Sequence, residues 1–199
     1  GEPNDGLRAM FTMMNNARLG VGGQGIGVAE AAFQHSTEYA LNRKQGKSTI
    51  QNKHGTIIDH ADVRRMLISM RADIFASRSI ELENAKAIDM ANATEEPEWI
   101  NKAAFLTPIT KVFGTEIGIN ISNLGVQIHG GMGFIEETGA AQFSRDVRVT
   151  AIYEGTNGIQ AMDLVGRKMM DNGETAYAII NQIKEYIDNL SGVKKDLSG

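Results

Sequence analysis

The sequence predicts an all-α fold, namely an antiparallel four-helix bundle with an additional C-terminal helix. Apolar residues recur at helical spacing in several long segments, and short polar breaks separate these segments, as expected for antiparallel neighbours in a bundle. The chain has only three prolines in 199 residues, a composition that favours helices. We therefore expect one helical domain over residues 1–199, with the bundle at about 6–170, the extra helix at about 174–190 and no strands.

The first helix is expected from about Gly6 to Arg43, since apolar residues follow one face of that segment. Within it, glycines at positions 20, 22 and 25 match G-x-G-x-x-G, a fingerprint of dinucleotide binding. That fingerprint requires a preceding buried strand, whereas residues 13–18 continue the helical pattern, so we reject it. The small residues instead indicate a neighbouring helix that packs closely. The expected apolar face comprises Met10, Met14, Ala17, Val21, Val28, Ala31, His35 and Tyr39.

Residues typical of helix ends predict where the first helix stops and the second begins. Gly46 is expected near the C-cap of the first helix with cations in its last turn, and residues 47–60 are polar and irregular. Asp59 and Asp62 then indicate an N-cap and an acidic first turn. The apolar stripe of this second helix comprises Val63, Met66, Leu67, Met70 and Ile74.

A charged break at residues 91–97 is expected to lead into a third helix, whose apolar stripe continues to Ile128 and which Pro108 could kink. After a glycine-rich stretch, the pattern that starts at Ile159 indicates a helix that ends near residue 172. The extra C-terminal helix follows it.

Composition and charge exclude several kinds of function. A net charge of −4 without a basic stripe argues against nucleic acid as a partner. No apolar run approaches the roughly 20 residues that a membrane span needs. The absence of cysteine excludes disulfides and thiolate catalysis, and the four histidines lack metal-ligand spacing, so no metal site is predicted.

Two glycine-rich turns, at residues 129–133 and 154–158, enclose the stretch that says most about function. Glu154 stands at the second turn, just before a new apolar-periodic segment. A carboxylate there can lie at a helix N-terminus, where free backbone N–H groups can meet a ligand, and it can serve as a general base. The same spacing is also typical of an ordinary helix start with Thr156 or Asn157 as N-cap.

Three motifs resemble the C-terminal domain of the acyl-CoA dehydrogenases in their order and spacing: QIHGGMGF at 127–134, Arg145-Asp146, and IYEGTNGIQ at 152–160. The segments EETGAA at 136–141 and YEGTNGIQ at 153–160 are similar to a bacterial subgroup that includes 3-methylmercaptopropionyl-CoA dehydrogenase-like enzymes. The resemblance covers about 6–168. It implies that an N-terminal helical domain and a middle β domain, which complete the family's active site, are absent from this chain.

The resemblance implies that Glu154 is the catalytic base, which removes the α-proton of an acyl-CoA thioester while the β-hydride leaves for N5 of FAD. Some relatives carry the base directly before the arginine that matches Arg18, but Ala17 occupies that position here. Arg18, Tyr153 and Gly155 match the substrate side of the site. A solvated or salt-bridged surface arginine and an ordinary buried tyrosine remain alternatives for the first two.

The resemblance also implies residues that bind FAD. Arg43 matches an arginine that reaches the pyrophosphate of a neighbouring subunit's FAD, although the aromatic residue usual in that element is Gln45 here. Thr156 matches a threonine near the flavin, whereas Gly158 replaces a common glutamine. The element that meets the adenosine-diphosphate part corresponds to Gln127, Gly130 and Gly131, for which a helix C-cap followed by a turn is the alternative.

The implied partners are an acyl-CoA substrate, an electron-transfer flavoprotein as electron acceptor, and further copies of the chain in a dimer or tetramer. The implied location is the bacterial cytoplasm, or the mitochondrial matrix in a eukaryote. The chain alone is expected to be inactive. Two alternatives stay open: an acyl-CoA oxidase with the same bundle and base, and a non-catalytic helical scaffold.

Overall fold

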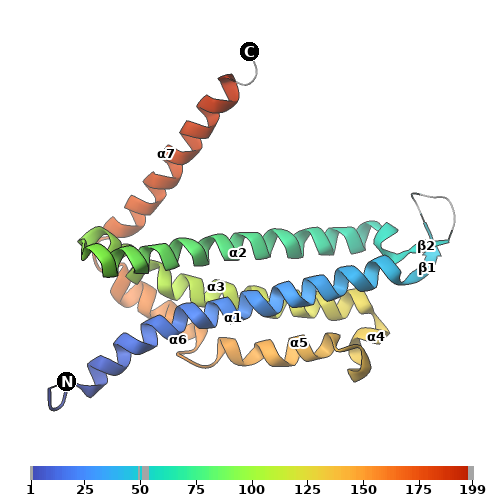
Figure 1. Cartoon of the computed structure of the whole chain (residues 1–199), viewed down its shortest axis with the longest axis horizontal. Helices are drawn as coiled ribbons and strands as arrows, with labels where there is room; N and C mark the ends of the chain where they lie inside the picture. The colour runs from blue at the N-terminus through green and yellow to red at the C-terminus, as the bar shows by residue number, and fades with distance from the viewer. Residues whose placement is uncertain (1, 49, 51–53, 197–199) are drawn as a thin grey trace.

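The computed structural model describes residues 2–48, 50 and 54–196, and helices dominate it. Three long helices, α1 (Gly6–Asn42), α2 (Ala61–Thr94) and α3 (Pro97–His129), lie side by side and alternate in direction (Figure 1). α3 contacts both α1 and α2 and lies at the centre of the bundle. The all-α prediction and the three long helices are confirmed.

The fourth member of the bundle is broken into short pieces that return along α3 (Figure 1). After α3 come α4 (Gly131–Phe134), a 3-10 turn (Glu136–Thr138) and α5 (Ala140–Val147). A second 3-10 turn (Arg148–Ala151) leads to α6 (Asn157–Asp163), which continues as a π-helical turn (Leu164–Lys168). The break before α6 contains Glu154, so the interruption of this helix positions the candidate base.

Two short strands, β1 (Lys44–Lys47) and β2 (His54–Thr56), pair antiparallel beyond the end of α1. The expectation of no strands was therefore wrong at this point. α1 ends at Asn42 because Arg43 adopts an extended conformation, and Gly46 lies within β1 with φ +73° rather than at a helix C-cap. A 3-10 turn (Ile57–Asp59) then leads into α2.

The buried face of α1 differs from the expected one. Met10 is exposed, and Met14, Ala17, His35 and Tyr39 are only half-buried. The face that packs in the bundle consists mostly of small side chains: Arg18, Val21, Gly22, Gly25, Ile26, Ala29, Ala32, Ser36 and Ala40. Small residues let the two backbones approach, so burial here follows side-chain size as well as hydrophobicity.

Gly22 and Gly25 show how close α1 and α3 come. A Cβ atom at Gly22 would lie 2.9 Å from the carbonyl oxygen of Thr110, and one at Gly25 would lie 2.5 Å from that of Gly114. Both distances are too short for any side chain, so these glycines are required by packing. The prediction that the glycine motif marks close helix packing is confirmed. Gly20 has open space around it and takes no part.

The core lies between the three long helices. The expected stripe of α2 is confirmed, since Met66, Leu67, Met70 and Ile74 are buried. They pack with Ile117, Ile121 and Ile128 of α3. Pro108 lies inside α3 without ending it.

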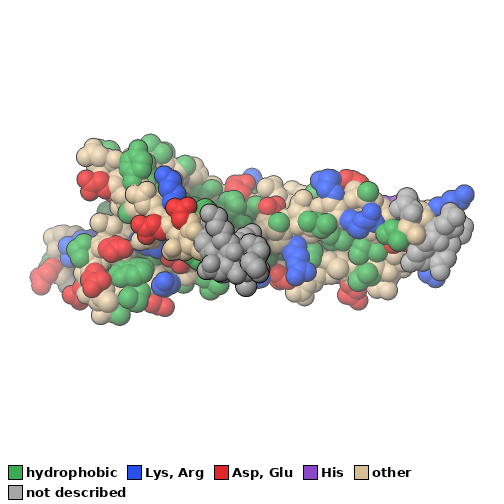
Figure 2. Space-filling model, turned by 90° about the horizontal axis from the view of Figure 1, so that it is seen from above, with side chains coloured by type: hydrophobic (Ala, Val, Ile, Leu, Met, Phe, Trp, Pro, Cys, Tyr) green, Lys and Arg blue, Asp and Glu red, His purple; other side chains and the backbone are tan. Residues whose placement is uncertain are grey.

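The additional C-terminal helix is α7 (Glu174–Asp196), which projects away from the bundle (Figure 1). Its apolar residues are exposed: Tyr177, Ile180, Ile183, Tyr186, Ile187 and Leu190. On the face that Figure 2 shows, basic and acidic side chains are interspersed with apolar ones. Within the described part of the chain, no helix combines the length and hydrophobicity needed to cross a bilayer, and no cluster of side chains could hold a metal ion.

Candidate functional site

The loop before α6 forms a sharp turn at Glu154. Glu154 has φ +54° and Gly155 has φ +87°, so two successive residues adopt the left-handed region. For a residue other than glycine this conformation is strained, and it persists only where surrounding contacts hold it. Such positions concentrate at functional sites, and the contacts that hold this one can be named.

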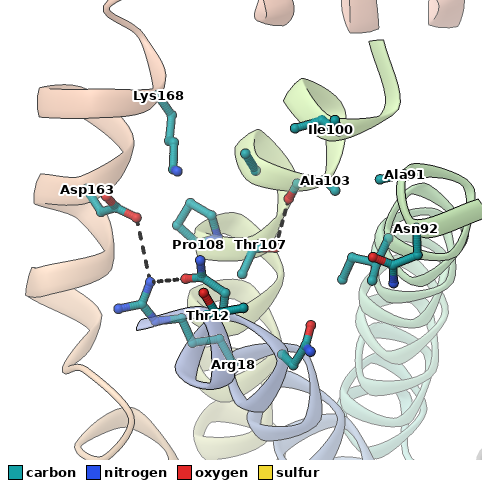
Figure 3. Close-up of a pocket in the computed structure, with 14 residues that line it drawn as sticks. Thr12, Arg18, Ala91, Asn92, Ile100, Ala103, Thr107, Pro108, Asp163 and Lys168 are labelled. Atoms are coloured by element: carbon teal, nitrogen blue, oxygen red, sulfur yellow. Dashed lines mark hydrogen bonds and ion pairs between the residues drawn. The ribbon is translucent and has the colours of Figure 1, made fainter. Parts of the chain in front are cut away.

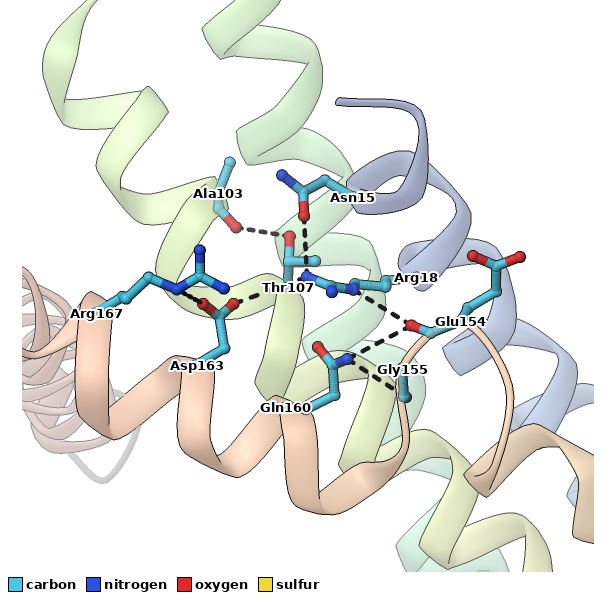
Figure 4. Close-up of polar contacts among 9 residues, drawn as sticks. All are labelled: Asn15, Arg18, Ala103, Thr107, Glu154, Gly155, Gln160, Asp163 and Arg167. Atoms are coloured by element: carbon cyan, nitrogen blue, oxygen red, sulfur yellow. Dashed lines mark hydrogen bonds and ion pairs between the residues drawn. The ribbon is translucent and has the colours of Figure 1, made fainter. Parts of the chain in front are cut away.

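Arg18 of α1 reaches the backbone of this loop (Figure 4). Its guanidinium is buried, and Nε donates a hydrogen bond to the backbone oxygen of Glu154 at 3.4 Å. Nη1 donates to Oδ1 of Asn15 at 3.0 Å and lies 3.7 Å from Oδ2 of Asp163, whose other oxygen pairs with Arg167. The alternative for Arg18 is therefore wrong about a surface position and right about a salt bridge, which Arg18 forms with Asp163. The structure makes Arg18 a direct support of the Glu154 backbone.

Gln160 of α6 holds the same turn from the other side. This residue is 0% exposed, and its Nε2 donates to the backbone oxygens of Glu154 at 3.5 Å and Gly155 at 3.4 Å. A Cβ atom at Gly155 would lie 2.6 Å from that nitrogen. Sequence reasoning assigned no role to Gln160, although it lies within the motif that carries the resemblance.

The carboxylate of Glu154 is free to act. The side chain is half-buried, and Figure 4 shows it pointing away from the contacts made by its own carbonyl group. Among the described residues, none donates a hydrogen bond to this carboxylate or pairs with it. The backbone is held while the charged group is left available, which is the arrangement that a general base requires.

Thr156 and Tyr153 flank the base. Thr156 is the N-cap of α6, and its Oγ1 accepts a hydrogen bond from the backbone nitrogen of Ile159 at 3.3 Å. The helix-start interpretation is thus confirmed for Thr156, and it is compatible with a base at Glu154. The hydroxyl of Tyr153 donates to Oε1 of Gln24 on α1.

Four of the five predicted cofactor residues come together at the opposite end of α1 and α3. Arg43, Gln127, Gly130 and Gly131 line one hollow of about 760 Å³. Thr156 is not among its lining residues and lies instead in the turn that contains Glu154. Helix α3 ends at His129 with Gly130 as C-cap at φ +60°, so the C-cap interpretation of this element is also confirmed.

His129 shows that this hollow suits a ligand with hydrogen-bonding groups. Its ring stacks between Tyr39 and His35, with centroid distances of 4.2 and 4.8 Å, and Nδ1 lies 2.7 Å from the backbone oxygen of Gly125. Burial lowers the pKa of His129, which favours the neutral ring; because a carbonyl oxygen accepts from Nδ1, Nε2 is the acceptor in that form. Nε2 is buried and has no partner among the residues that the structure describes. An acceptor here and the cation of Arg43 fit the polar groups and pyrophosphate of a dinucleotide.

A second hollow, of about 390 Å³, lies on the other side of Arg18 (Figure 3). Asp163 and Lys168 line one wall, and Thr107 and Pro108 of α3 line another. Glu154 is not among its lining residues, so this hollow is separate from the carboxylate of the candidate base.

Comparisons with known proteins agree with the motifs. Residues 4–170 match the family described as acyl-CoA dehydrogenase, C-terminal domain. The chain is 49% identical over 182 residues to 3-methylmercaptopropionyl-CoA dehydrogenase of Ruegeria pomeroyi, a match that covers 88% of the chain and 31% of that protein. It is 34% identical over 191 residues to a butyryl-CoA dehydrogenase of Syntrophomonas wolfei, covering 92% of the chain and 31% of that protein.

Solved structures show the same fold. The butyryl-CoA dehydrogenase of Megasphaera elsdenii matches with a TM-score of 0.70 and 29% identity, over 83% of this chain and 39% of that one. The chain spans 31% of the length of the two curated relatives named above. With the family's C-terminal domain matched over residues 4–170, the chain belongs to the acyl-CoA dehydrogenases.

Proposed function

We propose that this chain is the C-terminal helical domain of a FAD-dependent acyl-CoA dehydrogenase, in which Glu154 removes the α-proton of an acyl-CoA thioester. The observation that carries the proposal is the turn at Glu154. A carboxylate that pairs with none of the described residues stands on a left-handed residue whose backbone is held by Arg18 and Gln160. FAD would supply the acceptor for the hydride that leaves the β-carbon.

The position of the carboxylate matters because an α-proton next to a thioester is only weakly acidic. A general base must be held close to the proton, and misplacement by about 1 Å can cost on the order of 10²-fold in rate. The left-handed turn presents the Glu154 side chain outward, while its carbonyl group is fixed inward. Ala17, the position before Arg18, cannot accept a proton. Glu154 is therefore the residue that we assign as the base.

For the cofactor, we propose that Arg43, Gln127, Gly130 and Gly131 bind the adenosine-diphosphate part of a FAD held by a neighbouring subunit. These residues share one hollow with His129, whose buried Nε2 has no partner among the residues that the structure describes. Thr156 lies on the Glu154 side, where we propose that it approaches the flavin. Tyr153 and Gly155 lie beside the base, on the proposed substrate side.

For the partners, we propose a homo-oligomer and an electron-transfer flavoprotein as acceptor. Exposed apolar side chains on α7 and α6 support association, because large apolar patches mark interaction surfaces. The relative that is 49% identical is named for a methylthio-substituted propionyl-CoA, which supports a short acyl-CoA as substrate.

The test is to mix the full-length protein anaerobically with a series of acyl-CoA thioesters and follow the loss of oxidised flavin absorbance. We expect rapid bleaching with at least one thioester and reoxidation by electron-transfer flavoprotein. Hydrogen peroxide formation in air at the full rate of turnover would instead support the acyl-CoA oxidase. A lack of bleaching with every thioester would contradict both enzymes and favour a helical scaffold.

A further inference from the structure

A buried lysine lies under the second half of the catalytic turn. Lys111 of α3 is 0% exposed, and its Nζ donates a hydrogen bond to Oδ1 of Asn157 at 2.8 Å. Asn157 is the first residue of α6 and follows Glu154 by three positions. Lysine is almost never fully buried without a specific partner, because desolvation of its charge costs free energy. The contact with Asn157 therefore calls for an explanation.

Asn157 is held at both ends of its side-chain amide. While its Oδ1 accepts from Lys111, its Nδ2 donates to Oε1 of Glu116 at 2.7 Å and to Oγ1 of Thr115 at 3.1 Å. Lys111 and Thr115 are four residues apart on α3 and so share one face of the helix, and Glu116 follows Thr115 directly. Only an amide offers both an acceptor for the lysine and donors for the carboxylate and hydroxyl.

The electrostatic environment of Lys111 is unfavourable. Burial, followed by the nearby guanidinium of Arg18, lowers the pKa of Lys111 to about 8, and the carboxylate of Glu116 opposes this shift. A methionine of similar length would fill the same space without that penalty, and such replacements of buried charges are often neutral or stabilising. Packing alone thus gives no reason for an amine at this position.

We infer that Lys111 is a positioning residue for the catalytic base: with Asn157 it anchors the start of α6, as Arg18 anchors the carbonyl of Glu154. The turn from Glu154 to Asn157 is fixed at both ends by buried cations on two different helices. Lys111 donates to Asn157 and leaves the reacting carboxylate free. This inference rests on the proposed role of Glu154.

The experiment compares Lys111→Met with Lys102→Met in the full-length, flavin-loaded protein. Lys102 is a second buried lysine on α3, but it pairs with Glu83 and Gln182, away from α6. At saturating acyl-CoA, anaerobic flavin reduction by Lys111→Met should be slower by on the order of 10²-fold, the loss typical of a misplaced base. Substrate affinity, flavin content and melting temperature should be unchanged, or the melting temperature higher. Lys102→Met should react at the wild-type rate.

Asn157→Ala gives a second test should Lys111→Met fail to fold. It should slow flavin reduction at least as much as Lys111→Met does, since it also removes the bonds to Thr115 and Glu116. The double variant should be no slower than Asn157→Ala alone, because both changes break the same Lys111–Asn157 contact. A wild-type rate for Lys111→Met or Asn157→Ala, or a loss explained by lower flavin content, would overturn the inference. Glu154→Gln in the same assay separates the two proposals. If only Glu154→Gln is slow, the inference alone is wrong; if Glu154→Gln reacts normally, the assignment of the base is wrong.

Discussion

Nε of Arg18 lies 3.4 Å from the backbone oxygen of Glu154, although the two residues are 136 positions apart in the chain. This contact joins the first helix of the bundle to the loop before α6 and holds a strained backbone in place. Because Arg18 binds the carbonyl group and leaves the carboxylate free, fixing the base does not require neutralising it. The backbone of Glu154 thus has a structural role, while its carboxylate is left for the proposed chemistry.

Glu154→Gln is expected to slow anaerobic flavin reduction by acyl-CoA by about 10²- to 10⁴-fold, the usual loss when a general base is removed. The backbone contacts of residue 154 do not depend on its side chain, so the fold and the flavin content should be preserved. Stopped-flow absorbance measures the rate, and the absorbance ratio of flavin to protein measures occupancy. Bleaching at the wild-type rate would show that another residue is the base.

His129→Phe is expected to change how stability depends on pH. Burial lowers the pKa of His129 in the folded protein, while the unfolded chain binds a proton near the ordinary pKa of 6.5. As the pH falls below about 6.5, the unfolded state binds more protons than the folded state does. The stability that neutral, buried His129 contributes is therefore present above that pH and is lost below it. The variant should lose less stability between pH 7 and pH 5, as measured by urea unfolding at each pH. Equal slopes for the two proteins would contradict this account.

Gly25→Ala tests the close packing of α1 and α3. The new Cβ atom would lie 2.5 Å from the backbone oxygen of Gly114, and backbone atoms cannot move aside cheaply. We expect a loss of roughly 1–3 kcal/mol in the free energy of unfolding, as for other overpacked cores. Gly27→Ala is the matched control, because nothing lies within 4 Å of its Cβ position. Because glycine inside a helix is less stable than alanine, this control should stabilise the protein by about 0.5–1 kcal/mol.

The long helices could be predicted because their apolar stripes are long and few prolines interrupt them. Four of the five predicted residues of the α2 stripe are buried and the fifth, Val63, is half-buried, whereas the face of α1 was misplaced. Glycine, alanine and serine form the buried face of α1, and a search for large apolar side chains overlooks them. Strand β1, reading KQGK, lacks the β-branched and aromatic residues that signal a strand, so only its pairing with β2 reveals it.

The candidate site could be predicted only where a local motif carries it. Glu154 and Thr156 lie together in one such motif, and the helix start at Thr156 follows from capping chemistry alone. The supports of the turn come from elsewhere: Arg18 is on α1 and Lys111 is on α3. Lysine and arginine are usually exposed, so no pattern in the sequence marks these two as buried. Tertiary packing decides that, and it becomes visible only in the structure.

Gly155→Ala tests whether the shape of the turn matters for catalysis as well as for stability. At φ +87° an alanine is strained by about 1–2 kcal/mol, and its Cβ atom would lie 2.6 Å from Nε2 of Gln160. Gln160 must then move and release the backbone oxygens that it holds, so the Glu154 carboxylate shifts. We expect anaerobic flavin reduction to fall on the order of 10²-fold and the unfolding midpoint in urea to decrease.

Gly158→Ala is the control for that variant, because it adds the same methyl group three residues later. Gly158 lies inside α6, and the nearest atom to its Cβ position is Oγ1 of Thr156 at 3.9 Å, an ordinary contact. Alanine favours a helix over glycine, so stability should rise by about 0.5–1 kcal/mol with the rate of flavin reduction unchanged. If Gly155→Ala lost stability but kept the wild-type rate, the left-handed turn would serve the fold alone, and the base would tolerate a displaced backbone.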